Sequence, residues 1–292
     1  VFRTFDEHKT TYATIYNNVL QTNKATSKAR NYDSVLESYL YNDNIPTKVF
    51  TNLIEVAGKY NKSLKKYIRL RKKYLGLKQY HTYDRFLELA HSNKEYTYEE
   101  AKELFFNSIS QFPQDFQDKA HEVLKDGFVD VMEKVGKRTG AYSSSVANLH
   151  PFILLNFDNT LDSVFTVAHE AGHSIHSMYA TQTQPTMLQD YTIFVAEIAS
   201  TFNEHTLLDY FLSLPDATKE EKIMVIQKAI DEIMGTFYRQ TLFAEYEYLA
   251  NNEVAKGNPI NHQVLSQIMI DLYKKYYGLD ITKEGVKQYV WA

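Results

Sequence analysis

Two histidines four residues apart, His169 and His173, stand in the segment FTVAHEAGHSIH (165–176), with Glu170 directly after the first. If this segment is helical, residues four apart lie on one face, and both imidazoles can reach one Zn²⁺ ion at ~2.0–2.1 Å. Glu170 would lie about 100° around the helix axis from His169, where its carboxylate can act on a water bound to the ion. The spacing H-E-x-x-H therefore predicts two metal ligands and one general base.

The residues around this motif are mostly apolar, which predicts a buried helix over 164–180. Ionisable side chains in such surroundings are costly to bury unless they are paired or bind a ligand. Gly172 costs ~1 kcal/mol relative to alanine inside a helix, and close approach by another backbone or by the metal site would explain its presence. Because H-E-x-x-H also occurs by chance in unrelated soluble helices, the zinc interpretation requires a third ligand.

That third ligand must come from elsewhere in the chain. His176 follows His169 by seven residues. At a rise of 1.5 Å per residue it lies about 10 Å further along the axis, so it cannot converge with the pair on one ion. Glu197 is the better candidate, because it lies in a second apolar segment, 189–212, where a carboxylate would be buried without a partner unless it binds a metal. Its distance of 24 residues from His173 fits a loop and a helix that returns antiparallel to the first.

Glu204 lies two turns after Glu197, on the same face of the second expected helix. Its carboxylate could orient a ligand histidine through the second ring nitrogen, as carboxylates near metal sites often do. It could equally be an ordinary surface glutamate, and the sequence leaves both interpretations open.

The composition is typical of a soluble globular protein, with 292 residues, a formal charge of −4 and no cysteine. The lack of cysteine excludes disulfides and zinc sites built from thiolates, and it is compatible with the cytoplasmic location that we expect. The charge gives no electrostatic case for nucleic acid or an anionic membrane as a partner. No apolar run approaches ~18 residues, so no segment is expected to span a bilayer.

Most of the chain is compatible with helices, including those expected over 47–60 and 63–78. The lysines and arginines of the second are interpreted as a solvated helix face rather than a nucleic-acid patch. Thr97 and Thr218 each precede a glutamate by three residues and predict capping boxes at helix starts. By contrast, GKRTGAYSSSVANLHPFILLNF (136–157) passes from Gly, Ser and Asn to an apolar run, which predicts short strands and loops. The expected fold is mainly α, with a small β element beside the H-E-x-x-H helix.

Several separated motifs resemble one family. HEAGHSIHS and DYTIFVAEIASTFNE, together with ARNYDSVLESYLYNDNIP (29–46), YTYEEAKELF and the 136–157 segment, are similar to the oligoendopeptidase F branch of the thimet-oligopeptidase-like zinc peptidases. Because the likeness runs over most of the chain, it is far more specific than H-E-x-x-H alone. It implies a zincin-like helical oligopeptidase catalytic domain, with a helical lobe at 1–135, a zinc-site core at 136–212 and a second helical lobe at 213–292.

Carried over by position, the resemblance implies one Zn²⁺ ion held by His169, His173 and Glu197, with Glu170 as the general base. It also implies that Ala141 and Tyr142 touch the backbone of a peptide substrate. The implied function is that of a zinc metallo-endopeptidase, which hydrolyses short unstructured peptides with metal-activated water.

The family continues beyond the segment VKQYVWA (286–292) with a histidine and tyrosine cluster that contacts the substrate and supports the oxyanion, and this chain stops before it. We therefore expect the remaining segment to join the site, either as more of the same chain or as a second fragment. The alternative function is that of a catalytically incomplete fragment that keeps zinc and binds peptides.

Overall fold

The computed structural model describes residues 2–146 and 149–292. They form two compact units, of which unit 1 comprises Val1–Leu89 and Ile230–Ala292, and unit 2 comprises Ala90–Ala229. Among the residues described, none of the helices combines the length and the apolar character needed to cross a membrane. The three-part division implied by the resemblance stays a prediction.

Unit 1 is helical and is held together by two clusters of buried apolar side chains. Its longer helices are α1 (Phe2–Glu7), α2 (Lys9–Ala29), α3 (Val35–Leu40), α4 (Thr47–Lys59), α5 (Lys62–Tyr74), α11 (Arg239–Lys256) and α12 (His262–Tyr277). Short helical turns complete it: η1 (Thr82–Phe86), the π-helical η3 (Ile233–Tyr238), η4 (Ile281–Glu284) and η5 (Lys287–Tyr289). Helices α4 and α5 confirm the two helices predicted in this part of the sequence.

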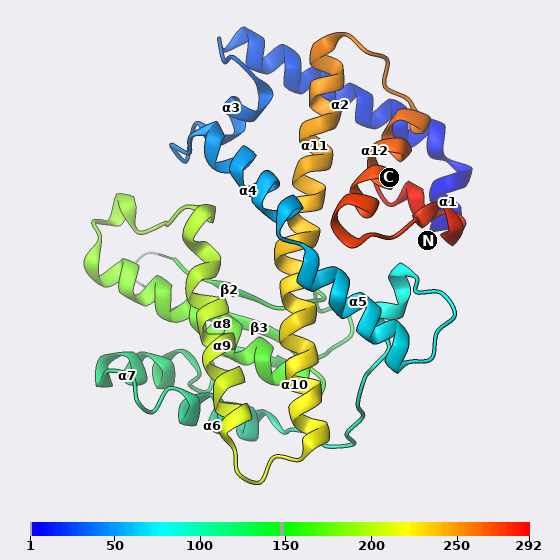
Figure 1. Cartoon of the computed structure of the whole chain (residues 1–292). Coiled ribbons are helices and arrows are strands. Elements are labelled where there is room, and N and C mark those ends of the chain that lie inside the picture. Colours follow the sequence, from blue (N-terminus) through cyan, green and yellow to red (C-terminus); the bar gives the residue numbers. More distant parts are fainter. Residues whose placement is uncertain (1, 147–148) are drawn as a thin grey trace. The chain divides into compact units, whose positions relative to one another are not determined.

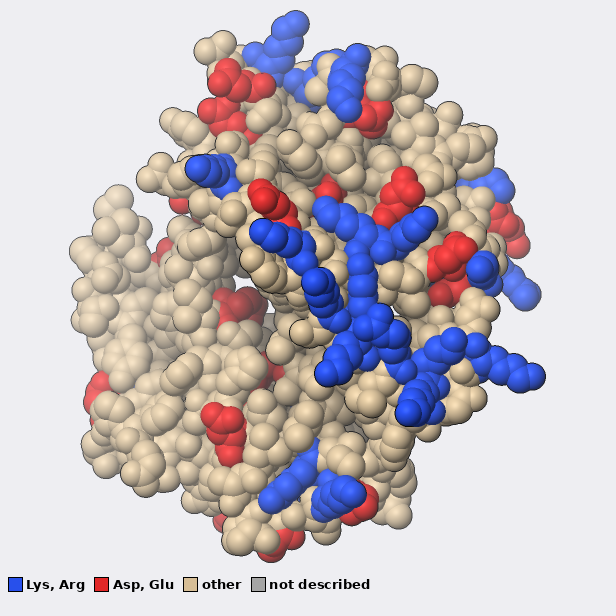
Figure 2. Space-filling model, in the orientation of Figure 1, with Lys and Arg blue, Asp and Glu red and all other residues tan. Residues whose placement is uncertain are grey.

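Most basic residues of helix α5 are exposed to solvent, but Arg71 is buried. Its buried face carries Leu64, Tyr67 and Ile68, while Arg69 and all its lysines except the half-buried Lys65 are exposed. Figure 2 shows basic side chains gathered in this part of the surface. Arg71 departs from the predicted solvated face because it is fully buried. Its guanidinium donates to the backbone carbonyls of Asp84, Arg85 and Leu87, and these hydrogen bonds offset the cost of burying the charge.

Unit 2 combines helices with a small sheet (Figure 1). Its elements are α6 (Tyr98–Ser108), α7 (Gln114–Val123), β1 (Val129–Met132), β2 (Tyr142–Ser144), β3 (Phe152–Phe157), α8 (Leu161–Thr183), η2 (Thr186–Leu188), α9 (Ile193–Ser213) and the greater part of α10 (Lys219–Glu232). Thr97 forms the predicted capping box with Glu100 at the start of α6. Thr218 and Glu221 exchange the equivalent hydrogen bonds at the start of α10.

The three strands run in the order β1-β3-β2, with β3 parallel to β1 and antiparallel to β2. Alternate residues of β3, namely Ile153, Leu155 and Phe157, are buried, and both β2 and β3 contact α8. This confirms the prediction of a mainly α fold with a small β element beside the H-E-x-x-H helix. Residues 147 and 148 of the predicted strand-and-loop segment lie outside the described residues.

Helices α8 and α9 are antiparallel and make the most extensive helix contact of unit 2 (Figure 1). Contacting pairs run in opposite directions along the two helices: His169 with Glu204, Gly172 with Ser200, and His173 with Glu197. A Cβ atom added to Gly172 would lie 2.7 Å from Ser200 Cα and 2.8 Å from the carbonyl oxygen of Ala199. The expected close approach of another backbone therefore explains this glycine.

Gly172→Ala should destabilise the protein by about 1–3 kcal/mol, because the new methyl group overlaps main-chain atoms that cannot rotate away. The measurement is the midpoint of urea unfolding, followed by circular dichroism. Gly235→Ala is the matched control, because Gly235 is also helical and an added Cβ there meets no atom within 4 Å. Equal midpoints for Gly172→Ala and the wild type would contradict the steric explanation.

Candidate metal centre

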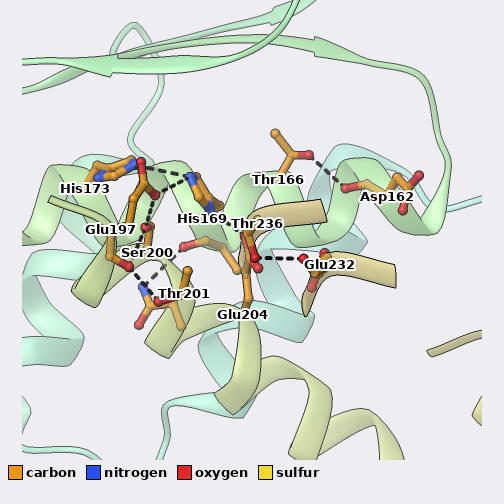
Figure 3. A network of polar contacts seen from close by, with 12 residues as sticks. Asp162, Thr166, His169, His173, Glu197, Ser200, Thr201, Glu204, Glu232 and Thr236 are labelled. Carbon is orange, nitrogen blue, oxygen red and sulfur yellow. Dashed lines mark hydrogen bonds and ion pairs between the residues drawn. The ribbon is translucent and has the colours of Figure 1, made fainter. Parts of the chain in front are cut away.

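Three side chains from α8 and α9 meet at one point (Figure 3). His169 and His173 of α8 place their Nε2 atoms 3.2 Å apart. Glu197 of α9 places Oε2 3.3 Å from Nε2 of His169 and 3.4 Å from Nε2 of His173. The i, i+4 spacing on α8 puts the two rings on one face, and the antiparallel course of α9 brings the carboxylate to them.

This triangle of ligand atoms fits a zinc ion. Tetrahedral ligands at ~2.0–2.1 Å from Zn²⁺ lie about 3.3–3.4 Å from one another, which is close to the three separations found here. Two imidazoles and one carboxylate are also a donor set that zinc commonly takes, and three protein ligands leave a fourth position for water. The structure therefore brings together the three residues that the sequence analysis named, while their role as ligands stays a proposal.

Glu204 touches the other side of the His169 ring (Figure 3). Its Oε1 atom contacts Nδ1 of His169. Burial disfavours the charged form of His169, but the hydrogen bond and the charge of Glu204 outweigh it, so the pKa of His169 lies above its usual value. When Nδ1 carries the proton, Nε2 presents its lone pair to the other two ligand atoms. This geometry corresponds to the orienting interpretation of Glu204 rather than to a free surface side chain.

His173 lies in different electrostatic surroundings from His169. Burial lowers its pKa, against the opposing effects of the Glu197 charge and of the Ala196 backbone. Low basicity favours the neutral imidazole, which is the form that binds a metal ion.

Glu197 is not buried as its apolar neighbours suggested, since its side chain is 60% exposed. The neighbours Phe194 and Ile198 are exposed as well. The argument from burial was therefore wrong, although the residue it selected does meet the two histidines. The largest apolar residues of this half of α9, namely Ile193, Phe194 and Ile198, are exposed and do not bury the carboxylate, whereas Val195, Ala196 and Ala199 are half-buried.

Glu170 has the opposite environment. Its side chain points into the protein, the residue is only 5% exposed, and Oε2 has no hydrogen-bond partner among the described residues. Burial raises the pKa of Glu170 to about 7, against the opposing charge of His169. A nearby divalent cation would lower this pKa again, because positive charge favours the carboxylate. A buried carboxylate with one oxygen free of hydrogen bonds, beside a candidate metal site, suits proton transfer.

Strand β2 is attached to α8 beside Glu170. The Ser143 hydroxyl lies 2.8 Å from the hydroxyl of Ser174, which is fully buried one turn after Glu170. The backbone N–H of Ser143 also favours the charged form of Glu170. Tyr142, the first residue of β2, is 43% exposed, and Ala141 precedes it. Within the described residues β2 pairs only with β3, so its other edge has no strand partner.

Two further residues complete the surroundings of the site. His176 stays outside the ligand group, as expected, and stacks on Tyr191 with ring centroids 3.8 Å apart. Ser200 was not singled out from the sequence, yet its hydroxyl donates to Oε2 of Glu197 at 2.8 Å. The signal that could have found Ser200 is its position three residues after Glu197, since residues i and i+3 are neighbours on a helix.

Solved structures share this fold over almost the whole chain. A Chlamydophila abortus protein superposes with a TM-score of 0.85 at 35% sequence identity, and the match covers 99% of this chain and 51% of the other. Oligoendopeptidase-F from Enterococcus faecium superposes with a TM-score of 0.73 at 27% identity, and the match covers 99% and 45%. The helices, the small sheet and their connections are thus those of a known peptidase architecture.

Sequence relatives point to the same family. Oligopeptidase PepF of Bacillus subtilis is 36% identical over 279 residues, which is 95% of this chain and 42% of the relative. An oligoendopeptidase F homolog of Lactococcus lactis is 32% identical over 292 residues, or 100% of this chain and 48% of the relative. The sequence pattern of Peptidase family M3 matches residues 2–291, and the chain belongs to this family. It spans about half the length of the relatives that it matches, and the resemblance to oligoendopeptidase F is confirmed.

Ser174→Ala should loosen strand β2, because it removes the hydroxyl that bonds to Ser143. Loss of one hydrogen bond worth about 0.5–1.5 kcal/mol predicts roughly 2- to 12-fold faster amide exchange in residues 142–144. Hydrogen–deuterium exchange with mass spectrometry measures this directly. Ser177→Ala is the control, because Ser177 is also buried on α8 but contacts Tyr191 instead of β2. Unchanged exchange in residues 142–144 of Ser174→Ala would show that this contact does not hold the strand.

Proposed function

We propose that this protein is a zinc metallo-endopeptidase that hydrolyses short peptides. The observation that carries the proposal is the triangle formed by Nε2 of His169, Nε2 of His173 and Oε2 of Glu197, with edges of 3.2–3.4 Å. Membership of Peptidase family M3 supports it, as do relatives named oligopeptidase and oligoendopeptidase. No other group of His, Cys, Asp and Glu side chains in the described part of the chain gathers in this way.

In this proposal the two histidines and Glu197 hold one Zn²⁺ ion, and Glu204 keeps His169 in the tautomer that presents Nε2. Zinc bound there would polarise the scissile carbonyl and lower the pKa of a coordinated water toward ~7. Burial lowers the pKa of His173, so near neutral pH few protons compete with the metal ion for its Nε2 atom.

Glu170 is the proposed general base. Its Oε2 atom is buried and lacks a hydrogen-bond partner, so it can accept the proton of the attacking water. The same oxygen can then deliver this proton to the amine that leaves when the peptide bond breaks. Burial also keeps bulk water away from the carboxylate, which helps to hold the transferred proton at this atom until the leaving group needs it.

The open edge of β2 is the proposed place for the substrate backbone. An extended peptide can add to a strand edge through main-chain hydrogen bonds, and these bonds depend little on side-chain identity. Ala141 and Tyr142 stand at the start of this strand, which supports their proposed contact with the substrate. The contact between Ser143 and Ser174 would set the distance between the bound peptide and Glu170.

His173→Ala should bind zinc at least 100-fold more weakly than the wild type, because two ligands cannot replace a set of three. The measurement is zinc content after dialysis against a chelator, with competition titration to give the affinity. His176→Ala is the matched control, because this histidine lies three residues further along α8 and outside the ligand group. Wild-type protein without zinc affinity, or equal affinity in His173→Ala, would exclude the proposed site.

Glu170→Gln should keep stoichiometric zinc but lose at least about 10²-fold in kcat, since general-base catalysis contributes on this scale. The amide preserves the size of the side chain and cannot accept the proton. Cleavage of a quenched fluorescent peptide library gives the rate, and metal analysis of the same sample gives the zinc content. Wild-type protein that binds zinc and peptides without cleaving them would favour the alternative of a peptide-binding, non-hydrolysing fragment. Near-normal turnover in Glu170→Gln would exclude its role as the base.

A further inference from the structure

The carboxylate of Glu197 accepts a hydrogen bond from the hydroxyl of Ser200, which lies one turn further along α9. Ser200 Oγ donates to Oε2 of Glu197 at 2.8 Å and also lies 3.1 Å from the Glu197 carbonyl oxygen (Figure 3). Oε2 is the same oxygen that faces the two histidine rings. Within the described residues no other side-chain hydroxyl or amide bonds to this carboxylate.

This contact matters because Glu197 is otherwise poorly held. Its side chain is 60% exposed, and an exposed glutamate has several freely accessible rotamers whose loss on ordering costs free energy. A ligand side chain that already adopts the binding rotamer loses less conformational entropy when the metal binds. A fixed donor beside Oε2 therefore raises metal affinity without touching the metal.

Ser200 itself is rigidly placed. It is fully buried, and its Cα atom lies only 2.7 Å from the place where a Cβ atom at position 172 would be. The absence of a side chain at position 172 lets α9 lie directly on α8 at this level. Because the Ser200 backbone packs against α8, the position of its Cα atom is fixed relative to His169 and His173. The Ser200 hydroxyl therefore starts from a defined place beside the two rings.

We propose that Ser200 is a positioning residue that holds Oε2 of Glu197 in the metal-binding rotamer. This inference rests on the proposed zinc site. It assigns to α9 a second supporting contact, independent of the one that Glu204 makes with His169. One proposed ligand on each helix is then oriented by a side chain of α9: His169 by Glu204, and Glu197 by Ser200.

Thr201 provides the comparison that separates positioning from general helix stability. Its hydroxyl also donates to Glu197, but to the backbone carbonyl oxygen at 2.6 Å. Thr201→Ala therefore removes a neighbouring hydroxyl and a hydrogen bond to the same residue, and leaves the carboxylate contact intact.

The test measures zinc affinity by competition with a chelator for the wild type, Ser200→Ala and Thr201→Ala. Loss of an outer contact to a ligand predicts roughly 10- to 100-fold weaker zinc binding for Ser200→Ala. Thr201→Ala should stay within about twofold of the wild type. The unfolding midpoint of the metal-free proteins is recorded alongside, and Ser200→Cys, which keeps the size of the side chain but is only a weak donor, replaces Ser200→Ala if the latter does not fold.

A coupling experiment decides between positioning and an indirect effect. In a Glu197→Ala background, Ser200→Ala should have no further effect on zinc affinity, because the group that it positions is gone. Equal affinity of Ser200→Ala and the wild type would overturn the inference, as would a full additional loss in the Glu197→Ala background. A wild-type protein that fails to bind zinc would instead overturn the proposed function, so the two failures are distinguishable.

Discussion

The close antiparallel contact between α8 and α9 is the constraint on which the site depends. Where Gly172 meets Ser200, backbone lies against backbone. This contact sets the separation of the two helices, so polar residues on either side of it face each other within hydrogen-bonding reach. His169 then meets Glu204, and His173 meets Glu197. The lack of a side chain at position 172 therefore allows two contacts between the helices. The contact of His173 with Glu197 belongs to the candidate ligand set, and the contact of Glu204 with His169 orients one of its rings.

Much of this arrangement could be predicted from the sequence, because it follows from local spacing. The i, i+4 histidines, the helix that returns with Glu197 and the capping boxes at Thr97 and Thr218 depend on periodicity and on hydrogen bonds within a few residues. The change from small polar residues to an apolar run before α8 likewise predicted the strands. Glu197 was selected for the wrong physical reason, since apolar neighbours predict burial only when another surface covers them.

The contacts that could not be predicted are those between segments distant in sequence. Nothing near Ser143 or Ser174 indicates that their hydroxyls meet, because they are 31 residues apart and joined by the packing of a strand on a helix. Arg71 is another example: its burial depends on carbonyl groups that a later turn presents to it. The two-unit organisation is also invisible locally, since unit 1 is assembled from both ends of the chain.

The glycine at position 172 has a consequence for how freely this part of the sequence can vary. An oversized side chain in a core is often accommodated by a smaller neighbour, but the atoms opposite Gly172 belong to the main chain of Ala199 and Ser200, which every amino acid shares. No exchange of side chains on α9 can therefore make room. Only a displacement of the whole helix could, and it would withdraw Glu197 and Glu204 from the histidines together. The position should be closed to substitution even where the surrounding apolar residues are interchangeable.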